Sequence, residues 1–198
     1  MTVTLFYIHD PMCSWCWGFS AVWQSILKQL PKGVQLETVL GGLAPDSDAP
    51  MPEDTQQFLK KTWKHIESVI PGTPFNYDFW SLCKPRRSTY PSCRAVIAAR
   101  AIDPKRELEM ISAIQTAYYL QAKNPSDAAV LIELAEAVGL DKTQFAKALN
   151  SADVEQSLEE NIHTFRNFGV TVGVSGFPSL VLKTHKGCAA IPIDYNNS

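Results

Sequence analysis

Two cysteines, Cys13 and Cys16, lie where one periodic pattern gives way to another, and this junction constrains the fold more than any other feature. The run from Val3 to Ile8 before them is typical of a β-strand, and the residues after them carry an apolar stripe with helical spacing. The stripe consists of Phe19, Trp23, Ile26, Leu27 and Leu30. Because Val34 to Leu40 predicts a second strand, this part of the chain indicates a β-α-β unit with parallel strands, which is half of a small α/β fold.

The spacing of the two cysteines suits a bond that forms and opens with little backbone movement. Positions i and i+3 in a helix's first turn share a face, with Cα atoms about 5 Å apart, inside the window of about 4.4–6.8 Å that a disulfide requires. A helix N-terminus also carries unpaired N–H groups and partial positive charge, which favour a thiolate over a thiol. We therefore predict Cys13 to be an exposed attacking sulfur and Cys16, which lies on the apolar stripe, to be a more buried resolving sulfur. A zinc site would need a second close-spaced pair, which Cys83 and Cys93 do not supply, so we predict no metal.

Composition and charge narrow the class of protein. The 198 residues are 45% hydrophobic and 19% charged, which is ordinary for a globular protein and sufficient for a sizeable core. A formal net charge of −2 argues against nucleic acid or an anionic membrane as a partner. Apolar runs stay well short of the ~18 residues of a membrane span, so no span is predicted. The first residues lack the pattern of a secretory signal, and we expect a cytoplasmic protein.

The chain divides into a part with strands and a part with helical periods alone. Strand signals return only near the end, at Leu180 to Lys183 and Ala189 to Ile193, after a helix predicted to stop at Gly169. We therefore predict a mixed sheet formed by residues 1–44 and 152–198, interrupted by a helical insertion domain of residues 45–151. Helices are predicted at 52–70, 92–102, 105–122, 127–138 and 142–150, with Ser126 and Asp141 as N-caps and Gly139 as a C-cap.

Four motifs together resemble the DsbA family and, more narrowly, its FrnE-like branch of thioredoxin-fold proteins. They are the runs Asp10 to Phe19, Gly41 to Pro45, Arg87 to Tyr90 and Gly176 to Leu180. The resemblance implies a thioredoxin fold interrupted by an all-helical domain. The chain departs from the best-known oxidising member by having Ser14-Trp15, without a histidine, between its cysteines.

The resemblance also assigns roles to particular residues. It implies that Cys13 is the nucleophile, Cys16 the resolving cysteine and Pro178 a cis-proline that faces the active site. The backbone at Phe177 would then present hydrogen-bonding groups to an extended substrate. Trp15 and Phe177 are the predicted substrate-binding side chains.

These features predict a thiol-disulfide oxidoreductase, with disulfide isomerisation as a further activity. Its substrates would be protein or peptide disulfides and thiols, with glutathione as a small-molecule candidate, and no cofactor is predicted because the dithiol itself carries the electrons. One alternative is a glutathione-dependent transferase or isomerase of a small molecule on the same fold. Another is a peptide-binding holdase with an apolar rim of Met12, Trp15, Trp17 and Phe177. For Trp17, packing against the insertion is an equally good interpretation.

Several other polar and sulfur-containing residues have simpler structural interpretations. We expect His9-Asp10 to end the first strand and to satisfy the start of the helix. Cys83, Cys93 and Cys188 are interpreted as small packing side chains. Arg86-Arg87 could bind an anionic group such as a glutathione carboxylate, but a solvated loop face is the preferred interpretation.

Overall fold

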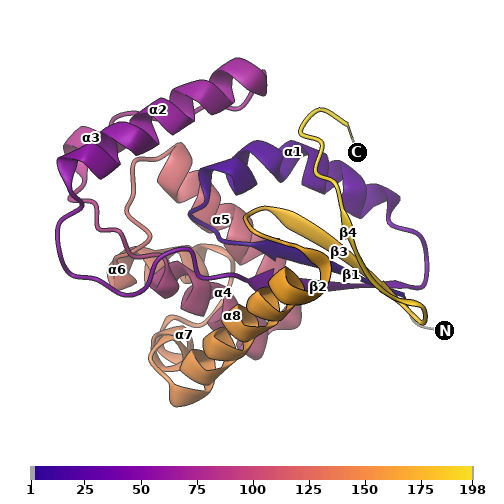
Figure 1. Ribbon diagram of the computed structural model, residues 1–198. Coiled ribbons are helices and arrows are strands. Elements are labelled where there is room, and N and C mark those ends of the chain that lie inside the picture. Colours follow the sequence, from indigo (N-terminus) through magenta and orange to yellow (C-terminus); the bar gives the residue numbers. More distant parts are fainter. Residues whose placement is uncertain (1–2, 198) are drawn as a thin grey trace.

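Four strands form one mixed sheet in the order β2-β1-β3-β4 in the computed structural model, which describes residues 3–197 (Figure 1). The strands are β1 (Val3–His9), β2 (Val34–Leu40), β3 (Ser179–Thr184) and β4 (Gly187–Ile191). β1 pairs in parallel with β2 and antiparallel with β3, and β3 and β4 form an antiparallel hairpin. The predicted mixed sheet with flanking helices is confirmed.

Helices cover both faces of this sheet. They are α1 (Ser14–Gln29), α2 (Glu53–Val69), α3 (Phe79–Leu82), α4 (Tyr90–Ile102), α5 (Glu107–Tyr119), α6 (Ala128–Ala137), α7 (Lys142–Leu149) and α8 (Ala152–Val172), with a 3-10 turn at Pro104–Arg106. α1 lies against one face and α8 against the other (Figure 1). Helices α2 to α7 fall between β2 and α8 in sequence, inside the predicted insertion, and the division of the chain into two domains stays a prediction.

The alternation of side chains along β1 supplies a core on each side of the sheet. On the α1 side, Leu5 and Tyr7 pack with Phe19 and Trp23 of the apolar stripe. On the α8 side, the buried residues are Phe6, Ile8, Val39, Phe168, Val174 and Val181. Because each fully buried side chain of this size contributes about 1.5–3 kcal/mol, the strand that leads to the cysteine pair is firmly anchored.

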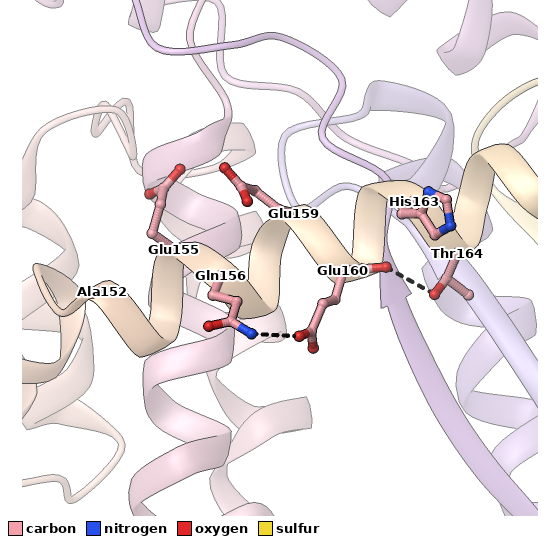
Figure 2. A pocket seen from close by; sticks show the side chains of 7 residues that line it. All are labelled: Ala152, Glu155, Gln156, Glu159, Glu160, His163 and Thr164. Carbon is pink, nitrogen blue, oxygen red and sulfur yellow. Dashed lines mark hydrogen bonds between the residues drawn. The ribbon is translucent and has the colours of Figure 1, made fainter.

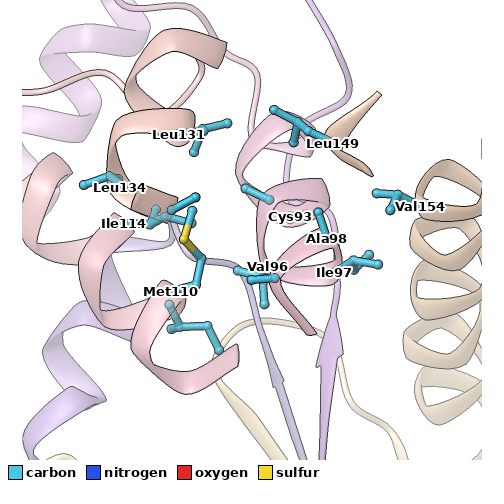
Figure 3. Packing of buried hydrophobic residues seen from close by; sticks show 14 of the residues in the cluster. Cys93, Val96, Ile97, Ala98, Met110, Ile114, Leu131, Leu134, Leu149 and Val154 are labelled. Carbon is cyan, nitrogen blue, oxygen red and sulfur yellow. The ribbon is translucent and has the colours of Figure 1, made fainter. Parts of the chain in front are cut away.

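A second core lies among the helices and centres on α4. This helix has buried residues on every side, including Cys93, Ala95, Val96, Ala98 and Ala99. Figure 3 shows its side chains between those of α5 and α6 on one flank and those of α7 and α8 on the other. Leu40 of β2 belongs to the same cluster, so the helical core continues into the sheet. Cys93 is a buried packing residue, as predicted.

The ends of the helices test the capping residues predicted from the sequence. Asp141 caps α7 as predicted, and its carboxylate accepts a hydrogen bond of 2.7 Å from the Gln144 amide. Gly139 follows α6 with a φ of +87°, the left-handed conformation expected of glycine beyond a helix C-terminus. The predicted N-cap Ser126 is wrong, because Asp127 occupies that position while the Ser126 hydroxyl donates to Ser88 O over 2.7 Å.

Two predictions near the C-terminus are also wrong. α8 does not stop at Gly169 but continues to Val172, since Phe168 packs on Phe6 and the left-handed C-cap is Gly173 with φ of +77°. Cys188 is exposed because β4 is an edge strand with little cover on either face. None of the helices within residues 3–197 combines the length and the apolar character that a membrane span needs.

Candidate active site

Cys13 is placed by the turn that joins β1 to α1. It is the N-cap of α1 with extended backbone (φ −78°, ψ 119°), its amide donates to Asp10 O over 3.0 Å, and its carbonyl accepts from Trp17 N over 3.1 Å. Cys13 is 7% exposed and Cys16, one turn on, is 0% exposed. The order of exposure is as predicted, but the expectation of a freely exposed Cys13 is wrong, because the sulfur lies in a pocket rather than on the surface.

The loop before β3 reaches across to this sulfur. The Cys13 Sγ donates to the carbonyl oxygen of Phe177 over 3.6 Å, and the Phe177-Pro178 peptide bond is cis. The Phe177 ring packs on Phe165 with ring centroids 4.6 Å apart. A Cβ atom built on Gly41 would lie 1.9 Å from the same ring, so glycine at the end of β2 is what lets Phe177 reach its place. The structure thus brings Cys13 and Phe177 into contact, while the role of Pro178 stays a prediction.

Cys16 is held as a protonated thiol by its surroundings. Burial raises its pKa well above the ordinary value, and the neighbouring Cys13 acts in the same direction. Tyr7 lies beside it, and the pKa of that phenol is also raised, first by burial and then by the two cysteines. The more buried sulfur is therefore uncharged at neutral pH.

Asp10 is a buried carboxylate that ties the turn before Cys13 to distant segments. Its Oδ1 accepts from Met12 N over 2.8 Å, and its Oδ2 accepts from Leu43 N over 2.8 Å and from the Thr89 hydroxyl over 2.6 Å. Burial raises its pKa, and these hydrogen bonds act in the opposite direction. The first strand ends at His9 as expected, but the expectation that Asp10 satisfies the start of the helix is wrong, because Met12 precedes the N-cap Cys13 and α1 has no side-chain cap. The bonds to Leu43 and Thr89 were not foreseen.

His9 differs from its neighbour because it lacks partners. It is 0% exposed, and neither ring nitrogen has a hydrogen-bond partner among residues 3–197. Its ring stacks on Tyr7 with centroids 4.6 Å apart. Burial, with a smaller effect of Arg100, lowers the pKa of His9 to about 3, so the imidazole is neutral at physiological pH.

A cavity of about 420 Å³ opens in front of Cys13. Its walls come from α1, α2, α5, α8 and the loops that follow β1, β2, α3 and α8. Besides Cys13 it is lined by Met12, Ser14, Trp15, Gly42, Leu43, Phe58, Leu59, Thr62, Arg87, Tyr118, Phe165, Ser175, Gly176 and Phe177. Most of these side chains are apolar, and Phe58 is 66% exposed. This is a pocket in which an apolar or peptide-like group could lie beside the sulfur.

The predicted substrate-binding residues occupy different places around this pocket. Trp15 and Phe177 line it, whereas Pro178 lines a neighbouring hollow between its own loop and β4. Sequence reasoning missed Phe58 and Phe165, which come from α2 and α8 and carry no local signal of their position. For Trp17 the packing interpretation is confirmed, since its indole donates to Pro74 O over 3.0 Å and stacks on Tyr119.

Helix α1 is also tied to α2 through a buried tryptophan. Trp63 of α2 is 0% exposed and donates from Nε1 to the Ser14 hydroxyl over 2.9 Å. Its ring is surrounded by the aromatic residues Phe75, Tyr77, Phe79, Trp80, Tyr118 and Tyr119. Ser14 stands between the two cysteines in sequence, so this hydrogen bond holds the first turn of α1 against α2.

A second hollow, on the outer face of α8, has a different character (Figure 2). All its lining residues come from one helix. Gln156 donates to Glu160 over 3.0 Å, and Thr164 donates to the Glu160 carbonyl over 2.8 Å (Figure 2). These polar groups are engaged within the helix itself. Across residues 3–197, no three His, Cys, Asp or Glu side chains are grouped so that they could hold a metal ion.

Comparisons with known proteins identify relatives of the same fold. A sequence model of the thioredoxin family matches residues 6–189. A solved structure named "putative protein disulfide isomerase", from Nitrosomonas europaea, is 26% identical with a TM-score of 0.85 and covers 100% of this chain and 92% of that chain. The cytosolic disulfide reductase DsbM from Pseudomonas aeruginosa is 25% identical with a TM-score of 0.81 over 96% of this chain and 89% of that one. DsbM with GSH is also similar, with a TM-score of 0.78.

Among curated proteins, the ClpXP adapter protein SpxH of Halalkalibacterium halodurans is 22% identical over 165 residues, covering 81% of this chain and 53% of the adapter. The adapter of the same name from Bacillus subtilis strain 168 is 23% identical over 85% of this chain and 55% of its own length. The chain thus spans about half the length of the curated relatives it matches. The solved neighbours are disulfide oxidoreductases and reductases, which supports the predicted enzyme class. The predicted fold and the predicted DsbA-like resemblance are confirmed: the chain belongs to the thioredoxin family.

Proposed function

We propose that this chain is a thiol-disulfide oxidoreductase in which Cys13 attacks and Cys16 resolves. One observation carries the proposal. The Cys13 sulfur lies at the N-cap of α1, 3.6 Å from the Phe177 carbonyl oxygen, in an apolar pocket, and Cys16 follows one turn deeper and fully buried. The similarity to a disulfide reductase supports it.

The reaction needs only the two sulfurs and a disulfide substrate. The Cys13 thiolate attacks one sulfur of the substrate disulfide, so that a mixed disulfide forms, the substrate S–S bond breaks and the first substrate thiolate leaves. The Cys16 sulfur then attacks Cys13, which forms the Cys13–Cys16 disulfide and releases the second thiolate. Two electrons pass from the dithiol to the substrate, and the two thiol protons end on the released thiols.

The burial of Cys16 sets the order of these steps. Its raised pKa keeps it protonated while Cys13 attacks, so the two sulfurs do not compete for the substrate. Conversion of Cys13 to a mixed disulfide removes one of the influences that raise the pKa of Cys16. The Cys16 proton must then leave before its sulfur attacks Cys13.

The partners and the location follow from the same proposal. DsbM is named a cytosolic disulfide reductase and has been solved with GSH. We propose that this chain works in the cytoplasm and exchanges with protein thiols and disulfides or with glutathione. Isomerisation of protein disulfides would use the same mixed disulfide, released by a substrate thiol instead of Cys16. The FrnE-like assignment stays a prediction.

A trapping experiment tests the assignment of the two cysteines. The Cys16→Ser variant should accumulate a mixed disulfide on residue 13 when it is incubated with a peptide disulfide, detected as an added peptide mass. The Cys13→Ser variant should form no such adduct and should lose insulin reduction. Cys188→Ser removes the exposed thiol on β4 and serves as the control that keeps full activity. Insulin reduction by Cys13→Ser at the wild-type rate would overturn the proposal.

A peptide-binding role without redox chemistry is the second candidate. It is favoured by the exposed Phe58 at the pocket and by the similarity to adapter proteins over 81% of the chain. The double variant Cys13→Ser/Cys16→Ser separates the two roles. A binding module would keep its suppression of client aggregation in this variant, whereas an oxidoreductase would lose all its function. A glutathione-dependent transferase would instead keep its turnover after loss of Cys16 alone.

A further inference from the structure

Arg87 is the one charged side chain among the residues that line the pocket in front of Cys13. It is partly exposed, and within residues 3–197 no hydrogen bond or ion pair engages its guanidinium. The adjacent Arg86 behaves differently, since it donates to Ser126 O and to the Asp127 carboxylate, each over 2.7 Å. The interpretation as a solvated loop face is therefore wrong for Arg86. Arg86 is a structural residue, and Arg87 presents unused hydrogen-bond donors to the pocket.

Hydrogen bonds on both sides of Arg87 fix the backbone from which its side chain extends. Pro85 O accepts from Met51 N over 2.8 Å, and Ser88 O accepts from the Ser126 hydroxyl over 2.7 Å. Thr89, two residues on, donates to the buried carboxylate of Asp10 over 2.6 Å. Arg87 thus extends from a segment that is held on both sides and is connected to the turn that carries Cys13.

The charge of Arg87 acts inside the pocket. Tyr118, which also lines it, has a pKa raised by burial, and the Arg87 guanidinium acts on that phenol in the opposite direction. The remaining side chains of the pocket are apolar or carry no positive charge, so Arg87 supplies the positive charge available to an anionic group there. A guanidinium in such a place prefers a carboxylate, which it can bind through two parallel hydrogen bonds.

We propose that Arg87 binds a carboxylate of the disulfide substrate, so that the pocket selects small anionic disulfides of the glutathione type over neutral ones. The volume of about 420 Å³ lies within the range of about 300–1,000 Å³ that is typical of small-molecule sites. Glutathione carries two carboxylates on either side of its cysteine, and its sulfur must reach Cys13 in the same pocket. The inference rests on the proposed function, because it names the substrate class of that site.

Steady-state reduction of two disulfides tests this selectivity. The probes are glutathione disulfide, which is anionic, and 2-hydroxyethyl disulfide, which is neutral. Because a hydrogen bond to a charged group contributes about 1.5–3 kcal/mol, Arg87→Gln should lower kcat/KM for glutathione disulfide by about 10- to 100-fold. The value for the neutral disulfide should change by less than about twofold, and Arg87→Lys should recover part of the loss.

Lys84→Gln is the matched control, since it removes a positive charge from an exposed residue of the same loop that does not line the pocket. An equal fall for both disulfides in Arg87→Gln would overturn the inference, because Arg87 would then act on Cys13 and not on the substrate. The inference would also be overturned if Lys84→Gln lowered kcat/KM for glutathione disulfide as much as Arg87→Gln does. The effect would then come from the overall positive charge of the loop. Absence of wild-type turnover for both disulfides would instead contradict the proposed function.

Calorimetric binding of S-methylglutathione separates the site from the chemistry, because this ligand has no free thiol to exchange. We expect saturable binding by the wild-type chain, the same affinity in Lys84→Gln, and an affinity about 10- to 100-fold weaker in Arg87→Gln. Unchanged affinity in Arg87→Gln would overturn the inference even if disulfide turnover were normal. Arg87-dependent binding without turnover would support the inference and contradict the redox function.

Discussion

Replacement of His9 by phenylalanine should make the stability of the protein less sensitive to acid. His9 is fully buried, its ring nitrogens lack partners, and burial lowers its pKa to about 3 from 6.5. The unfolded chain therefore binds a proton on His9 as the pH falls below 6.5, while the folded chain does not. The contribution of the neutral His9 is present above pH 6.5 and is lost as the pH falls toward 3. His9→Phe keeps an aromatic ring to stack on Tyr7 and removes the titrating group.

The size of the effect follows from the difference in pKa. One unit corresponds to about 1.4 kcal/mol, so at pH 5 the wild-type chain should have lost about 2 kcal/mol through His9 relative to pH 7.5. His9→Phe should lack this part of the loss. At pH 7.5 the variant should be at least as stable as the wild-type chain, because it no longer buries two polar atoms without partners.

Urea unfolding at a series of pH values from 7.5 to 4.5 measures this directly. The difference in free energy of unfolding between wild type and His9→Phe removes the contributions of all other titrating groups. The exposed His185 in the β3–β4 turn provides a control, and His185→Gln should keep the slope of the wild-type chain. The reasoning would be refuted if His9→Phe lost as much stability between pH 7.5 and 5 as the wild-type chain.

Three further substitutions test individual contacts of the site and its scaffold. Gly41→Ala should lower the free energy of unfolding, measured with urea, by about 1–3 kcal/mol and slow disulfide turnover, because the new methyl group would displace the Phe177 ring. The loss of stability should disappear when Phe177 is also replaced by alanine. Asp10→Asn should cost about 1–3 kcal/mol, because the amide nitrogen cannot accept the buried hydrogen bonds that the carboxylate accepts, and a smaller loss would argue against this bonding. Asp141→Ala should lower the free energy of unfolding by about 1 kcal/mol and leave disulfide turnover unchanged, which checks that loss of stability alone does not alter the site.

The sequence predicted the features that depend on local pattern. The period of the apolar residues after Cys16 defined α1, and the strand before Cys13 placed the pair at the N-terminus of that helix. The run Val34 to Leu40 is strand β2 with the predicted bounds. These features are predictable because the spacing of apolar residues within a short segment distinguishes a helix from a strand.

Features that depend on contacts between distant segments were not predictable in this way. Phe58 and Phe165 meet at the pocket only because α2 packs on α1 and α8 packs on β2. Neither residue differs in sequence from an ordinary surface or core aromatic. The exposure of Cys188 follows from the place of β4 at the edge of the sheet. The continuation of α8 through Gly169 depends on the packing of Phe168 against β1, which outweighs the low helix propensity of glycine.

Hydrogen bonds join the turn before α1 and its first turn to the segments that follow β2, and they limit which parts of this protein can be exchanged. The Ser14 hydroxyl of α1 accepts a hydrogen bond from Trp63 of α2. The Asp10 carboxylate, before α1, accepts one from Thr89, just before α4. A chimera in which residues 45–151 are exchanged for those of a relative would have to keep the tryptophan and the threonine to accommodate the dithiol motif. The helices between β2 and α8 are thus a poor unit for modular swapping, and we expect natural variation of the two parts to be correlated at these positions.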